Sequence, residues 1–187
     1  MTYNGSIGAY TGIATLNSSL PPSGSISVNA TDLQAHTVEI ASTFNIASVT
    51  KNQDATVWSS DGQAEAYIPA NALSADGRVS IVPDQAAGAV PSGLVLLAGP
   101  YAFQAESGVS LNQAANLSLF YLDTGGTLNR ANLATARIYQ WNGQNWIGLT
   151  STHNSSQKYV SASITSFGTY VLMAQQQEKI SLPLVIK

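Results

Sequence analysis

Short stretches in which apolar and polar residues alternate recur along most of the chain. Two of the clearest, residues 136–141 and 146–149, flank the turn Asn142-Gly143-Gln144-Asn145, and two more, residues 159–164 and 169–173, follow. Alternation with a period of two is typical of a strand with one buried face, and Asn-Gly between two such runs favours a hairpin. The C-terminal third is therefore predicted to be antiparallel β-structure.

The upstream chain shows the same pattern, with runs that end at Gly, Pro or Asp-Gly. The expected strands are residues 25–28, 37–46, 56–58, 64–73, 77–83, 94–97, 101–105 and 115–122. Many short strands at regular spacing predict an all-β antiparallel sandwich rather than a βαβ fold. The one helical candidate, Asn129 to Thr135, is short.

Composition suggests a body with an appendage at each end. Residues 1–20 form a Gly-rich arm or edge strand, and a Pro-Pro-Ser-Gly turn separates it from a sandwich body over residues 21–174. Residues 175–187 form a polar tether and an apolar strand.

The charge content limits the expected partners, whereas the absence of cysteine leaves the redox compartment undecided. Only 9% of the 187 residues are charged, the net charge is −3, and there is no cysteine. The few Lys and Arg residues are scattered and form no basic stripe that could neutralise phosphates, so we expect no nucleic-acid binding. No apolar run approaches membrane-spanning length, so we expect no transmembrane segment. Neutral polar surfaces are common in secreted β-proteins, and the start lacks the features of a signal peptide, so the sequence fits either a cytoplasmic or an already processed protein. We expect a processed protein that is secreted or displayed at the cell surface.

Four segments carry a resemblance to a known family. Asp61-Gly62, residues 66–73, residues 109–121 and residues 164–170 look like a ZU5-type β-sandwich with its following partner segment, over about residues 57–174. Such domains occur in the ankyrin and netrin-receptor families and in bacterial surface proteins. The resemblance implies a scaffold for protein contacts.

Some relatives in that family cleave themselves at a His-Phe-Ser triplet, where the Ser hydroxyl attacks the preceding peptide bond with help from the His. The matching triplet here is Ser166-Phe167-Gly168. Both reactive side chains are absent, so we expect no self-cleavage. Phe167 is instead expected in the core.

Other catalytic and metal signals are weak. His36 and His153 have no partner at ligand spacing, and there is no Gly-x-Ser-x-Gly elbow and no marked pair of carboxylates. Asp61, Asp76 and Asp123 lie beside glycine-containing turns, where their oxygens would either cap the turn or bind Ca²⁺. We favour turn chemistry and expect no cofactor.

Aromatic residues of the C-terminal hairpin are candidates for stacking on sugar rings. They are Tyr139, Trp141 and Trp146. The turn is expected to separate the two tryptophans and to leave at least one of them in the core.

The C-terminal octet suggests assembly. Its apolar residues are Ile180, Leu182, Leu184, Val185 and Ile186. Pro183 and Lys187 suit an edge strand, which would dock on its own sandwich or complete the sheet of a neighbour. The ending also resembles that of many secreted proteins of Chloroflexi-type bacteria, which implies an export or surface-retention signal.

These observations lead to one expected function and one alternative. We expect a non-enzymatic extracellular structural subunit that self-assembles into homo-oligomers or filaments by exchanging a terminal strand. The alternative is a surface adhesion module that binds carbohydrate or protein.

Overall fold

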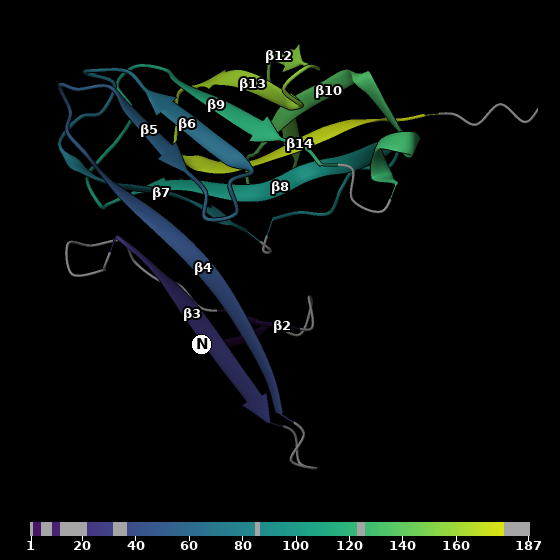
Figure 1. Cartoon of the computed structure of the whole chain (residues 1–187), viewed down its shortest axis with the longest axis horizontal. Helices are drawn as coiled ribbons and strands as arrows, with labels where there is room; N and C mark the ends of the chain where they lie inside the picture. The colour runs from purple at the N-terminus through teal and green to yellow at the C-terminus, as the bar shows by residue number, and fades with distance from the viewer. Residues whose placement is uncertain are drawn as a thin grey trace, which may run out of the picture.

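Two antiparallel sheets lie face to face and form the body of the protein (Figure 1). The computed structural model describes residues 2–4, 9–11, 22–31, 37–84, 87–122 and 126–177. The smaller sheet has the order β12-β13-β9-β6-β5, and the larger has the order β11-β10-β14-β8-β7-β4-β3. The all-β antiparallel sandwich predicted from alternation is confirmed.

The five-stranded sheet consists of β5 (Ala55–Trp58), β6 (Ala64–Ile68), β9 (Ala115–Phe120), β12 (Ser151–Asn154) and β13 (Tyr159–Ile164). The seven-stranded sheet consists of β3 (Ser23–Thr31), β4 (Thr37–Val49), β7 (Gly77–Pro83), β8 (Leu94–Ala105), β10 (Ala131–Trp141), β11 (Trp146–Gly148) and β14 (Gly168–Gln176). A separate pair is formed by β1 (Thr2–Asn4) and β2 (Ala9–Thr11).

The core lies between the two sheets because each strand turns its apolar residues inward. Leu117 and Leu119 of β9 are fully buried, as are Ile138 of β10 and Leu172 of β14. The chain passes from one sheet to the other several times, for example between β13 and β14, which lie in different sheets. This repeated crossing joins the two layers into one hydrophobic core.

The β3–β4 pair extends away from the sandwich as a two-stranded ribbon (Figure 1). Only the last residues of β4, Ile46 to Val49, pair with β7, whereas the earlier residues of β4 pair with β3. The pairing of the two strands continues to the base of the ribbon, where the backbone N–H of Ile46 donates to the carbonyl of Pro22 at 2.6 Å.

Two local expectations are wrong. The helix expected over Asn129–Thr135 is a 3₁₀ turn, η1 (Thr127–Arg130), and Ala131 already has the extended backbone of β10. Pairing with β14 decides the conformation there, because sheet contacts outweigh the weak helical preference of a short segment. The runs 94–97 and 101–105 are one strand, β8, in which the register with β14 shifts near Gly99-Pro100. The described residues contain no helix that would reach across a bilayer.

Candidate functional site

The two described aspartates that were considered for Ca²⁺ cap turns. Oδ1 of Asp61 accepts hydrogen bonds from Ser59 Oγ at 2.6 Å and from the N–H of Gln63 at 3.0 Å. Oδ1 of Asp76 accepts from the N–H of Lys51 at 2.7 Å. No group of three or more potential metal ligands occurs among the described residues, and Asp123 lies outside them.

The triplet that matches the family's cleavage site has structural contacts. Ser166 accepts a hydrogen bond from Gln140 Nε2 at its hydroxyl, and its carbonyl accepts one from the Tyr170 hydroxyl at 2.7 Å. Phe167 is half-buried and packs against the core through Phe103, with ring centroids 4.8 Å apart. These contacts fix the connection between β13 and β14, where the chain passes from one sheet to the other.

Of the two histidines, His36 lies outside the described residues. His153 lies on β12 with its Nε2 2.7 Å from the hydroxyl of the buried Tyr121. Burial raises the pKa of Tyr121, and its hydroxyl shares one hydrogen bond with the His153 ring nitrogen, in which the imidazole tautomer sets the donor. The pair joins β12 to the residue that follows β9.

The structure brings Tyr139, Trp141 and Trp146 together on the outer face of the seven-stranded sheet. Trp141 and Trp146 are directly paired across the hairpin, with ring centroids 5.1 Å apart. Both are half-buried, so the expectation that the turn separates them and leaves one in the core is wrong. The Trp146 indole donates to the Gly88 carbonyl at 3.1 Å, and the Trp141 ring lies against Gly88.

These contacts fasten a connection that we term the strap, residues 84–93 between β7 and β8, of which 85 and 86 lie outside the described residues. Asp84 accepts a hydrogen bond from Thr169 Oγ1 near the start of β14, and the Gly93 carbonyl accepts one from the N–H of Gln176 at its end. We infer that the strap covers the outer face of β14. This cover explains why Val171 and Met173 are buried although they face away from the inter-sheet core. The hairpin tryptophans therefore have a structural partner.

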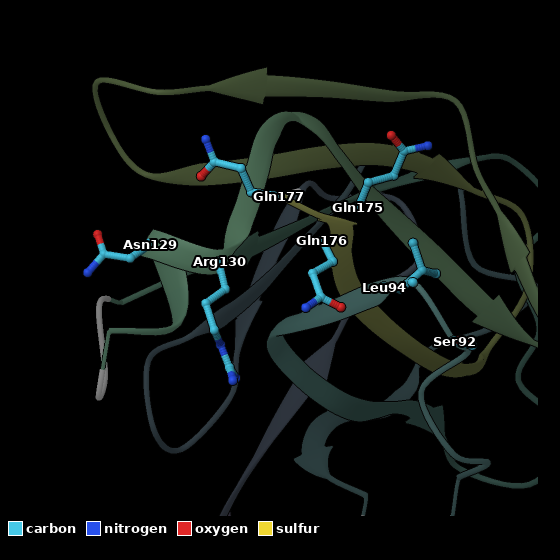
Figure 2. A pocket seen from close by; sticks show the side chains of 8 residues that line it. Ser92, Leu94, Asn129, Arg130, Gln175, Gln176 and Gln177 are labelled. Carbon is cyan, nitrogen blue, oxygen red and sulfur yellow. The ribbon is translucent and has the colours of Figure 1, made fainter. Parts of the chain in front are cut away.

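A cavity of about 1080 Å³ lies where β14 ends. In Figure 2, Arg130 and Gln176 extend to one side, whereas Gln175 and Gln177 point the other way. The lining residues that the structure describes supply amides and one guanidinium. They include no carboxylate or imidazole, so they offer no general base.

Three aromatic side chains on the outer face of the five-stranded sheet form what we term the aromatic row: Trp58, Phe120 and Tyr159. Trp58 and Phe120 are stacked, with centroids 5.6 Å apart and planes at 28°, and Phe120 and Tyr159 are 5.3 Å apart. Trp58 is 42% exposed, and the other two rings are half-buried. The row is a solvent-facing apolar strip that crosses the sheet at the ends of β5 and β9.

Beside the aromatic row lies a line of polar residues, the polar row. The polar row consists of Glu65 on β6, Ser118 on β9, Ser161 on β13 and Thr152 on β12, each paired directly with the next. Glu65 is in turn paired with Trp58 on β5, so the series of pairs spans all five strands. Partial burial raises the pKa of Glu65. Tyr67, 41% exposed, lies two residues further along β6 on the same face.

Sequence reasoning missed this face. Trp58, Phe120 and Tyr159 each adjoin a core residue in their strand, so alternation alone places each ring on the outer side. They come together only through the pairing of β9 with β13 and the position of β5, which a single sequence does not supply.

The apolar C-terminal residues from Ile180 to Ile186 lie outside the described residues, and their role as an assembly strand stays a prediction. A scan of family models finds none that matches the chain, and no similar protein is found among curated proteins. The resemblance to ZU5 domains therefore also stays a prediction.

Proposed function

We propose that the protein is a non-enzymatic extracellular module that binds carbohydrate polymers through the outer face of its five-stranded sheet. The observation that carries the proposal is the aromatic row, a line of three rings with the polar row beside it. This is the adhesion function that the sequence left as the alternative, at different residues.

The chemistry of the face matches a polyhydroxylated ligand. A pyranose presents an apolar C–H surface that packs on an aromatic ring, and its equatorial hydroxyls bond to groups at the edge of that ring. Trp58 would provide the ring, and Glu65 and Ser118 would provide an acceptor and a hydroxyl. An open face suits a polymer that passes across it, whereas a small molecule is usually enclosed in a pocket.

Binding without catalysis fits the same residues. Glycoside hydrolysis ordinarily requires two carboxylates on either side of the scissile bond, about 5–10 Å apart. The polar row contains a single carboxylate, that of Glu65.

Affinity electrophoresis in gels that contain soluble cellulose derivatives, xylan, glycol chitin or β-1,3-glucan tests the proposal. We expect at least one polymer to retard the protein, and Trp58→Ala and Tyr159→Ala to weaken this binding about 10-fold or more, as loss of an anchoring aromatic does. The matched control is Ile147→Ala, which truncates a 49% exposed side chain on the other sheet. The proposal fails if no polymer retards the protein, or if the two aromatic variants bind as tightly as the control.

Self-assembly through the C-terminal strand is the second proposal. It is supported by the apolar octet after the tether and by the architecture, in which chains can extend each other's sheets. Negative-stain microscopy and light scattering on the full chain and on a truncation after Gln177 test it. Filaments that vanish on truncation support strand exchange, whereas identical particles contradict it.

A further inference from the structure

The sheet edges of this protein differ in length. Three edge strands of the two sandwich sheets are short: β11 has three residues, and β5 and β12 have four each. The fourth, β3, has nine residues and lies at the end of the seven-stranded sheet. An edge strand presents unpaired N–H and C=O groups, and proteins commonly keep such edges short to prevent unwanted pairing.

The long edge also lacks the usual protection. Ser23–Thr31 contains no charged residue and no proline, and its nine register pairs with β4 continue without a bulge. Ser23, Gly24, Ser25 and Ser27 are exposed. Lys, Pro and bulges are the common features that block edge pairing, so among the described strands β3 pairs only with β4 and its other edge can take a further strand.

From this edge we infer that β3 pairs with β3 of a second copy of the chain, antiparallel and about a two-fold axis at Ser27. The two ribbons then form one four-stranded sheet, in the order β4-β3-β3-β4. This interface needs neither a ligand at the aromatic row nor the C-terminal octet.

The sequence of β3 favours a second copy over an unrelated strand because it is self-complementary in this register. Ser27 lies opposite its own equivalent, Ile26 lies opposite Val28 of the second copy, and Ser25 lies opposite Asn29. Apolar positions meet apolar positions, polar meet polar, and no like charges oppose each other. Both copies use the same surface, so the interface gives a closed dimer and does not continue into a polymer.

A single nine-residue edge buries less surface than the ~1,200 Å² of a stable interface. We therefore expect a weak dimer, populated at about 100 μM. Two aromatic rows in one dimer would also bind a repeating polymer together, which raises the apparent affinity through effective concentration.

Charge substitution at the two-fold axis tests the pairing in the full chain by sedimentation velocity. Ser27→Lys places two cations opposite each other, and Ser27→Glu places two anions there, so each variant alone should be monomeric where the wild type is dimeric. An equimolar mixture of the two variants should recover the dimer. Because Ser27 is exposed and its partner on β4 is Ala41, neither change disturbs the core.

The matched control is Ser163→Lys, the same change at an exposed position of β13, which should leave the dimer intact. Circular dichroism verifies that every variant folds. A wild type that is monomeric at the highest soluble concentration overturns the inference. So do Ser27 variants that dimerise like the control, or a mixture of the two variants that stays monomeric.

Discussion

The hydroxyl of Tyr101 donates a 2.7 Å hydrogen bond to Oδ2 of Asp61, and the two residues belong to opposite layers of the sandwich. Tyr101 lies on β8 of the seven-stranded sheet, and Asp61 lies in the turn between β5 and β6 of the other sheet. Burial and the Asp61 carboxylate raise the pKa of Tyr101, so the phenol stays protonated and donates. One carboxylate therefore shapes a turn and joins the two sheets.

Removing this bond should lower stability. Tyr101→Phe leaves Oδ2 of Asp61 without its partner, and we expect the free energy of unfolding to fall by about 1–3 kcal/mol, the range for a partly buried bond to a charged acceptor. Urea denaturation measures the change. The control is Tyr67→Phe, at a 41% exposed tyrosine whose hydroxyl bonds to Asp54, which should cost markedly less than Tyr101→Phe. An equal fall in the free energy of unfolding in both variants would contradict a specific contribution of the Tyr101–Asp61 hydrogen bond.

The strap should tolerate no side chain at Gly88. A Cβ there would overlap the ring of Trp141, and such overpacking costs about 1–3 kcal/mol. Thermal unfolding of Gly88→Ala should show the loss. The loss should shrink in a Trp141→Ala background, because the overlapping ring is gone; additive effects of the two substitutions would contradict this contact.

The turn of the C-terminal hairpin depends on the side chain of Asn142. Its Oδ1 accepts hydrogen bonds from the N–H groups of Gln144 at 2.9 Å and Asn145 at 2.7 Å. Asn142→Ala should therefore lower the free energy of unfolding by about 0.5–2 kcal/mol, in line with one or two exposed bonds. Gln144→Ala, in the same turn, removes no described side-chain bond and serves as the control. Comparable losses from both changes would refute the role of Asn142.

Glu65 should give stability a small dependence on pH. Partial burial raises its pKa in the folded state, so the folded protein binds this proton more tightly than the unfolded chain does. Ionisation of Glu65 therefore destabilises the fold as pH rises from below the ordinary glutamate pKa of about 4.3 to above the raised value. Glu65→Gln should be more favourable relative to wild type at about pH 7 than at about pH 3.5. Urea denaturation at both values measures this, and a difference of opposite sign would contradict it.

Alternation predicted most strands because each has one buried face. It was sufficient for β6, β9 and β13, in which buried residues occupy every second position. For β14 the strand was predicted over residues 169–173, but alternation did not predict that Tyr170 to Ala174 are all buried. The inner face packs on the core, whereas the strap, a segment whose sequence indicates only a loop, is hydrogen-bonded near both ends of the strand and is inferred to cover its outer face. Long-range cover of this kind leaves no local pattern.

The candidate site depends on register in the same way. Trp58 and Tyr159 are separated by about half the chain, and each appears in the sequence as an ordinary aromatic at a strand end. Their alignment with Phe120 follows from strand order and pairing, which many sequences with the same alternation would not share. The hairpin tryptophans were prominent in the sequence because they lie close together along the chain. Their contacts with Gly88 give them a structural role instead.

The position of β14 has a mechanical consequence. This strand is antiparallel to both of its neighbours, β10 and β8, and ends at Gln176 in the interior of the seven-stranded sheet. A pulling force applied at Gln177 would act along two hydrogen-bonded ladders at once and load them in shear, whereas a force on an edge strand breaks bonds one after another. A protein anchored from this end would resist tension through a strand with five consecutive buried residues.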